Sequence, residues 1–216
     1  MPWGTVANAI SWRSISVGAR LHASIGEHGR GKLVQSADVF LYLWFNADEH
    51  WPRWVVQLIV WAGVWVPKAL MAGLAVLALI RPEWRRVLWL AMLSLALTWV
   101  MVRVFRTWLP MPRPAALDLG VQWLAQGERP GFPSMHAAGS FAVAMVMLLL
   151  RGGWLAWFYL GAGLLVSLSR LVLGLHFPLD IAVGALLGSL VAVCVAGVAQ
   201  RALLPWRASV PRRKTP

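Results

Sequence analysis

Charged residues are scarce in this chain of 216 residues, at 13% against 59% hydrophobic residues. An ordinary soluble domain carries about 25% charged residues. Mean hydropathy is +0.65, and several apolar stretches approach or exceed the ~20 residues with which a helix crosses a bilayer. The scarcity of charge therefore excludes an ordinary soluble domain and predicts an all-α integral membrane protein.

Cysteine is nearly absent too, because Cys194 is the only one in the chain. A single thiol cannot form an intrachain disulfide, and a metal site built on several thiolates is excluded with it. The N-terminal region also has no continuous apolar core followed by a cleavage site, as a signal peptide would have.

Acidic residues are few, 8 against 20 Lys and Arg, which gives a net charge of +12. Two kinds of partner attract such a charge, namely nucleic acid, and anionic lipid or phosphate. The basic residues lie between and beside the apolar stretches. We therefore expect the partners to be the lipid bilayer and a lipid phosphate or diphosphate, and no nucleic acid; the oligomeric state stays open.

Five apolar segments are long enough, with their flanks, to be transmembrane helices. They are 54–80, 87–105, 137–150, 154–169 and 179–200. A shorter apolar run at 39–45 is predicted to be an interfacial helix or a sixth span. Around this membrane domain, 37–204, we expect a mobile basic N-terminal tail at 1–36 and a basic C-terminal tail at 205–216.

The loops fall into two groups by the side of the membrane on which they lie. Loops 81–86 and 151–153 share one side with the C-terminal tail and are rich in arginine. Because positive loops stay inside, that side is predicted to be cytoplasmic. The polar segments 106–136 and 170–180 then face the periplasm or the cell exterior.

Lys68 follows Pro67 near the middle of the first apolar segment. A charge in mid-membrane is unfavourable and marks a candidate functional residue. A proline kink and water inside the bundle would equally let this lysine snorkel or pair with a neighbour. The sequence leaves both interpretations open.

The outward stretch Ser169 to Asp180 sets Arg170, His176 and Asp180 among apolar residues. Pro178 suits the first position of a helix, because its missing N–H would be unpaired there. Asp180 then lies in the first turn, where the helix dipole favours its charge, and its carboxylate can reach back to His176. Such a pair holds an imidazole in the tautomer that a nucleophile needs. The stretch therefore predicts a catalytic site.

Two further outward segments carry residues suited to phosphate. Arg106 and Arg113 are separated by six residues in a proline-stiffened segment, and guanidinium groups match phosphate oxygens. Ser134 and His136 precede the third span, where a helix N-terminus binds anions and a histidine can transfer protons. Taken alone, the first segment could be a basic loop, and the second a capping serine beside an interfacial histidine.

The three segments together resemble the signature of the type 2 phosphatidic acid phosphatase superfamily. That signature reads Lys-x6-Arg-Pro, Pro-Ser-Gly-His and Ser-Arg-x5-His-x3-Asp. The matching residues are Arg106-x6-Arg113-Pro114, Pro133-Ser134-Met135-His136 and Ser169-Arg170-x5-His176-x3-Asp180. The third segment is complete, whereas Arg106 replaces a lysine and Met135 replaces a glycine. Met135 keeps its backbone N–H but loses the conformational freedom of glycine.

The resemblance implies a lipid phosphatase that needs no metal or other cofactor. His176 would attack the terminal phosphorus and form a phosphohistidine, with Asp180 orienting it. His136 would protonate the leaving oxygen and then activate the water that releases phosphate. The groups implied to hold the phosphoryl oxygens are Arg106, Arg113, Ser134, Met135 and Arg170.

The small size and the segment 38–47 with its following Trp-Pro look similar to bacterial undecaprenyl-diphosphate phosphatases of this superfamily. We therefore expect hydrolysis of undecaprenyl diphosphate at the outer face of the bacterial inner membrane. A phosphatidylglycerophosphate phosphatase or a lipid A phosphotransferase would use the same residues. A protein that only binds lipid phosphate needs neither nucleophile nor proton donor, and a soluble vanadate-dependent haloperoxidase lacks membrane spans.

Overall fold

The structure is a computed structural model that describes residues 29–125 and 129–201. The expected tail at 205–216 and most of the expected tail at 1–36 lie outside these residues. The described part is helical and contains no strand. This confirms the predicted all-α class.

The first described element is α2 (Gly29–Phe45), with 17 residues. It begins ten residues before the predicted helix at 39–45, so the end of the stretch expected to be a tail is helical. Its apolar run, 39–45, is shorter than a membrane span. The described residues up to Trp44 fall in one compact unit, and those from Phe45 onward fall in another.

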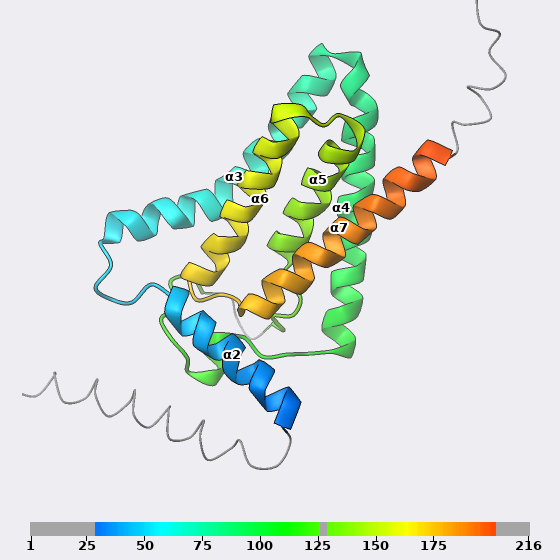
Figure 1. Cartoon of the computed structure of the whole chain (residues 1–216). Helices are drawn as coiled ribbons and strands as arrows, with labels where there is room; N and C mark the ends of the chain where they lie inside the picture. Colours follow the sequence, from blue (N-terminus) through cyan, green and yellow to red (C-terminus); the bar gives the residue numbers. More distant parts are fainter. Residues whose placement is uncertain (1–28, 126–128, 202–216) are drawn as a thin grey trace, which may run out of the picture. The chain divides into compact units, whose positions relative to one another are not determined.

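The second unit is a bundle of five long helices (Figure 1). They are α3 (Arg53–Ile80), α4 (Arg85–Trp108), α5 (Met135–Leu150), α6 (Gly153–Val172) and α7 (Pro178–Arg201), with short 3-10 helices η1 (Pro82–Trp84) and η2 (Pro114–Leu117) in the connections. All five predicted helices are present. Four helical stretches are long and apolar enough to cross a membrane by themselves: α3, η1 with α4, α6 and α7.

Helix α5 is the shortest of the five and the most enclosed. Its 16 residues rise ~24 Å, somewhat less than the ~30 Å of a hydrocarbon core. It packs against α4, α6 and α7 and lies among them in Figure 1. Its buried face is rich in Ala137, Ala138, Gly139 and Ala142, and small residues let membrane helices approach closely.

Two glycines on α7 make the contact with α5 especially close. A Cβ atom on Gly184 would lie 2.6 Å from the carbonyl oxygen of Ser134, and one on Gly188 would lie 1.9 Å from that of Ala138. Only glycine allows backbones to meet in this way. The contact brings the first turn of α7 to the start of α5, where the Ser134 N–H donates to the Asp180 carbonyl at 2.9 Å.

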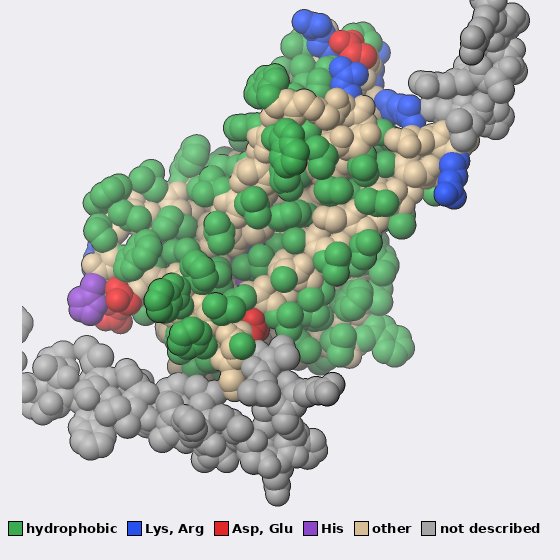
Figure 2. All heavy atoms as spheres, in the orientation of Figure 1, with side chains coloured by type: hydrophobic (Ala, Val, Ile, Leu, Met, Phe, Trp, Pro, Cys, Tyr) green, Lys and Arg blue, Asp and Glu red, His purple; other side chains and the backbone are tan. Residues whose placement is uncertain are grey.

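The outside of the bundle matches a membrane environment. Figure 2 shows hydrophobic side chains over most of the visible face, with Lys and Arg gathered at the end where α3 meets α4. That connection carries Arg81, Arg85 and Arg86. Large apolar side chains such as Trp89 on α4 and Trp154 on α6 are exposed. The chain is thus a multi-pass membrane protein.

Helix α3 contains Pro67 and changes direction along its length (Figure 1). The next residue, Lys68, is exposed on the outside of the helix. Its Nζ lies 4.6 Å from the centroid of the Trp65 ring, within the range of a cation–π interaction. Lys68 therefore contacts an aromatic ring of its own helix on an exposed face of α3, which favours the interpretation that it pairs with a neighbour.

Candidate active site

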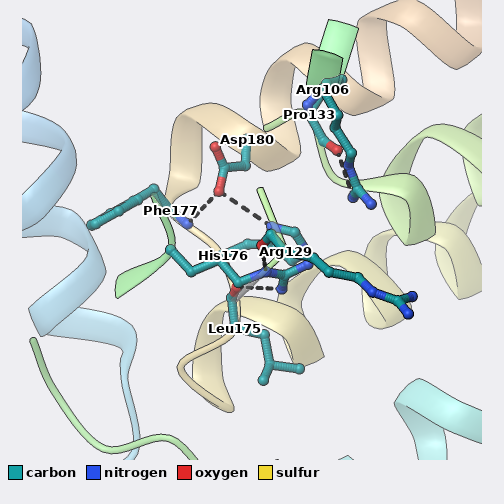
Figure 3. Close-up of polar contacts among 8 residues, drawn as sticks. Arg106, Arg129, Pro133, Leu175, His176, Phe177 and Asp180 are labelled. Atoms are coloured by element: carbon teal, nitrogen blue, oxygen red, sulfur yellow. Dashed lines mark hydrogen bonds and ion pairs between the residues drawn. The ribbon is translucent and has the colours of Figure 1, made fainter. Parts of the chain in front are cut away.

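His176 and Asp180 form a buried pair between α6 and α7. The Asp180 Oδ2 atom lies 3.2 Å from Nδ1 of His176 and accepts a hydrogen bond of 3.0 Å from the Phe177 N–H (Figure 3). His176 is 2% exposed and Asp180 4%. The carboxylate favours a proton on Nδ1, which leaves the lone pair of Nε2 free. The pairing predicted from the sequence is confirmed.

The surroundings of His176 keep its ring neutral. Burial lowers the pKa of His176 from its ordinary value of 6.5, the hydrogen bond and charge of Asp180 oppose this shift, and the charges of Arg113 and Arg106 add to it. A neutral imidazole with a free Nε2 is a competent nucleophile. Such a ring can act as a base or a nucleophile near neutral pH.

Arg113 holds the loops on either side of this pair. Its Nε donates to the carbonyl of Arg129 at 2.9 Å, and its Nη1 donates to the carbonyl of Leu175 at 3.1 Å. Burial lowers the pKa of Arg113, and the nearby charge of Arg106 adds to this effect; an arginine nevertheless stays protonated. Arg113 therefore fixes the residue before His176, a role that the sequence did not reveal, and its predicted contact with phosphate stays a prediction.

Ser134 occupies the N-cap position of α5, and its side chain does not cap the helix. The residue is fully buried, and its hydroxyl has no hydrogen-bond partner among the described residues. A capping serine would accept a bond from a backbone N–H of the first turn. The interpretation of Ser134 as a structural cap is therefore contradicted.

Two arginine nitrogens are, like the Ser134 hydroxyl, buried without a hydrogen-bond partner among the described residues. They are Nε of Arg106, at the end of α4, and Nε of Arg170, at the end of α6. Nη2 of Arg106 donates a hydrogen bond of 3.1 Å to the carbonyl of Pro133 (Figure 3), and this bond orients the guanidinium group. An unpaired buried polar group costs about 1–3 kcal/mol, and phosphoryl oxygens would satisfy several such donors at once.

His136 is the second residue of α5 and completes the cluster. The charges of Arg106 and Arg113 act on both His136 and His176, and the charge of Arg170 acts on His136. The positive field there comes from arginines. In 36–125 and 129–201, no three His, Cys, Asp or Glu side chains come together in a way that could hold a metal ion.

A largely apolar cavity of about 200 Å³ opens beside His136 and runs between helices of the bundle. Its walls include Pro67, Leu70 and Met71 of α3, Leu95 of α4, Met135 and Val143 of α5, and Tyr159 of α6. Met135, predicted to offer its backbone N–H to phosphate, thus turns its side chain to this cavity. A hydrocarbon chain is the natural occupant of such a space.

Asn46 is a structural residue of the site that sequence reasoning missed. Its Nδ2 donates to the carbonyls of Val121 at 3.0 Å and Val172 at 3.1 Å, and its Oδ1 accepts from the Val121 N–H at 2.7 Å. The Trp123 N–H then donates to the carbonyl of Leu173 at 3.1 Å. The turn that leads to His176 is therefore clamped from two sides. Asn46 stands just after an apolar run, and nothing local in the sequence indicates that it reaches so far.

A buried histidine paired with a carboxylate, together with two arginine nitrogens that have no partner among the described residues, suits phosphoryl transfer. The family model described as the PAP2 superfamily matches residues 87–203, which include all three segments of the site. The chain belongs to the PAP2 superfamily and is a PAP2-type membrane lipid phosphatase.

Two curated relatives agree with this assignment, and a solved structure shares the fold. The chain is 31% identical over 170 residues to a lipid A 4'-phosphatase of Bacteroides thetaiotaomicron, covering 73% of this chain and 74% of the relative. It is 25% identical over 165 residues to the provisionally named undecaprenyl-diphosphatase YbjG of Escherichia coli strain K12, covering 72% and 79%. The crystal structure of Aquifex aeolicus LpxE shares the fold, with a TM-score of 0.63 at 24% identity, over 74% of this chain and 94% of that one.

Proposed function

We propose that the protein hydrolyses undecaprenyl diphosphate to undecaprenyl phosphate at the periplasmic face of a bacterial inner membrane, through a phosphohistidine on His176. The observation that carries the proposal is the buried His176–Asp180 pair, together with donors of Arg106, Ser134 and Arg170 that have no partner among the described residues. A site that only bound lipid phosphate would need the donors but not an activated histidine.

The first step is attack by Nε2 of His176 on the terminal phosphorus. A P–N bond forms, the bond from phosphorus to the bridging oxygen breaks, and its electron pair leaves with that oxygen. His136 gives a proton to the leaving oxygen. Arg106, Ser134, Arg170 and the backbone N–H of Met135, together with Arg113, stabilise the charge on the phosphoryl oxygens.

The second step releases phosphate. His136, now neutral, takes a proton from a water molecule as that water attacks the phosphorus of the phosphohistidine. The P–N bond breaks, inorganic phosphate leaves, and the electron pair returns to Nε2 of His176. Because arginines supply the positive charge, we expect the reaction to proceed without a metal ion.

The apolar cavity supports a substrate with an isoprenoid chain. It adjoins His136, the proposed donor to the leaving oxygen, so it lies where the remainder of the substrate would extend. An isoprenoid suits its largely apolar walls, whereas a sugar ring would leave hydroxyl groups without partners there.

The likeness to a lipid A 4'-phosphatase favours a second candidate, hydrolysis of a phosphate on lipid A. Both reactions use the same residues and differ in the group that fills the cavity. The orientation of the site rests on the arginine-rich connection at 81–86, at the opposite end of the bundle, which the positive-inside rule assigns to the cytoplasm.

The test is phosphate release by detergent-purified protein in the presence of EDTA. Undecaprenyl diphosphate, lipid A, phosphatidylglycerophosphate and phosphatidic acid are compared, using the wild type and H176A. H50A is the matched control, because His50 is an exposed histidine outside the site. We expect fastest release from undecaprenyl diphosphate, loss of release in H176A and full release in H50A.

Faster release from another lipid would contradict undecaprenyl diphosphate as the substrate and would leave the proposed mechanism unchanged. Loss of release in EDTA that returns with added metal would contradict the metal-free route. No release from any lipid, with wild type and H176A alike, would contradict hydrolysis itself.

A further inference from the structure

Pro67 lies inside α3 and therefore removes one hydrogen bond of that helix. In an α-helix the N–H of each residue donates to the carbonyl four residues earlier, and proline has no N–H. The carbonyl of Gly63 thus has no donor from residue 67. Nη2 of Arg170 donates to this carbonyl instead, so an arginine of the active site is bonded to the acceptor that the proline leaves open.

Gly63 gives this contact its space. A Cβ atom at Gly63 would lie 2.5 Å from Oγ of Ser169 and 3.3 Å from Nη2 of Arg170. Ser169 cannot move away freely, because its hydroxyl donates to the carbonyl of Val166 at 2.7 Å. Gly63 and Pro67 act together, since one allows the close approach and the other supplies the acceptor.

A second bond fixes α3 against α6 on the other side of the proline. The hydroxyl of Tyr159 donates to the carbonyl of Leu70 at 2.8 Å. Tyr159 and Arg170 lie about three turns apart and therefore on the same face of α6. Helix α6 thus donates to one carbonyl before Pro67, that of Gly63, and to one after it, that of Leu70. These two bonds fix the position of α6 along α3 on both sides of the bend.

We propose that Pro67 is a positioning residue for Arg170, and that the free Gly63 carbonyl orients the guanidinium so that its Nε faces the phosphoryl group. The proposal rests on the function proposed above. Arg170 is 2% exposed, and its Nε has no partner among the described residues. With Nη2 held by Gly63, the fork is oriented before substrate binds, and pre-oriented donors stabilise a transition state without reorganising.

The variant P67A separates positioning from a merely structural role. An alanine N–H at position 67 would bond the Gly63 carbonyl and compete with Arg170 for it. Proline is unfavourable in a helix interior, so the thermal unfolding temperature of P67A should equal or exceed that of the wild type. Its kcat should fall about tenfold or more with little change in KM, because a small misplacement of a transition-state contact lowers kcat.

The chain offers a matched control at the far end of the same helix. Pro82 lies two residues after the last residue of α3, and Nε of Arg85 donates to the nearby carbonyl of Ala78 at 3.3 Å. P82A makes the same chemical change next to an arginine–carbonyl bond that is remote from the site. It should leave kcat and KM unchanged.

A readout without turnover makes the test independent of the substrate. Orthovanadate mimics the transition state of phosphoryl transfer, and its dissociation constant can be followed by thermal shift. That constant should rise about tenfold in P67A and stay unchanged in P82A. Unaltered kcat and unaltered orthovanadate binding in P67A would overturn the assignment.

A double-mutant cycle identifies Arg170 as the group through which Pro67 acts. In an R170K background, P67A should lose most of its effect on kcat and on orthovanadate binding, because the fork that Gly63 orients is gone. A full effect of P67A in that background would contradict the proposal. A wild type that binds orthovanadate but releases phosphate from no lipid would contradict the proposed function alone.

Discussion

His176 can attack phosphorus only while Nε2 carries its lone pair, so the charge of its ring sets activity on the acid side. Burial lowers the pKa of His176 below 6.5 despite the opposing effect of Asp180. The neutral form is thus present above this lowered pKa and is lost as the pH falls through it. We expect the acid limb of kcat/KM against pH to have its midpoint below 6.5.

The variant D180N tests whether the acid limb of kcat/KM against pH comes from His176. Loss of the carboxylate removes the influence that raises the pKa of His176, so the midpoint should move to still lower pH. It also removes the group that orients the ring, and kcat should fall by ~10²–10⁴. A wild-type midpoint above that of free histidine, or a D180N midpoint that moves to higher pH, would refute this account of the nucleophile.

Ser134 provides a second prediction at the scale of a residue. Its buried hydroxyl neither caps α5 nor finds a partner among the described residues, so S134A loses no stabilising bond and relieves a burial penalty of about 1–3 kcal/mol. S134A should therefore be at least as stable as the wild type in thermal unfolding, while kcat falls about tenfold or more because a transition-state donor is lost.

Ser189, in the middle of α7, is the matched serine for this test. S189A should keep the kcat of the wild type. A drop in the stability of S134A by the ~1 kcal/mol typical of a lost cap, with kcat intact, would mean that Ser134 is structural after all.

At the scale of elements, the contact between α5 and α7 aligns the two halves of the site. A Cβ atom at Gly188 would lie 1.9 Å from the carbonyl oxygen of Ala138, whereas one at Gly197 of the same helix would meet nothing within 4 Å. G188A should therefore lower the thermal unfolding temperature and phosphate release together, because the helices must separate and Ser134 moves from Asp180.

G197A is the paired control on α7. Alanine is favoured over glycine in a helix by about 1 kcal/mol, so G197A should keep its activity and be as stable as the wild type or more so. Equal effects of the two substitutions on stability and activity would show that the α5–α7 contact does not set the site.

The parts of the site that the sequence predicted are local in the chain. His176 and Asp180 are four residues apart at a helix start, so their pairing follows from helix geometry. The five long helices of the bundle followed from apolar length. The helix before them was predicted too short, because the apolar run begins at Val39 while α2 begins at Gly29.

The remaining features depend on which helix faces meet, and a one-dimensional pattern does not specify that. Asn46 bonds Val121 and Val172, far away in the sequence. Gly184 and Gly188 can be recognised as close-packing residues only once α5 is known to lie against them. The two bonds of Arg113 to backbone carbonyls could likewise be recognised only once the positions of both loops were known.

At the scale of the whole molecule, the bundle places one phosphoryl-transfer site at the end of an apolar body, opposite its arginine-rich connection. A lipid phosphatase needs such an arrangement, because the substrate's chain stays among helices while its phosphate meets arginines and histidines. The central claim is that the phosphoryl group passes through His176.

Trapping the covalent intermediate tests that claim most directly. The purified protein is mixed with undecaprenyl diphosphate labelled at its terminal phosphate, quenched in alkali within its first turnover, and mapped by mass spectrometry. We predict an alkali-stable, acid-labile phosphate on His176 in the wild type, none in H176A, and slower formation and slower release of the label in H136A, because His136 serves both steps. Label on another residue, or rapid hydrolysis with no protein-bound phosphate in either wild type or H136A, would contradict the account.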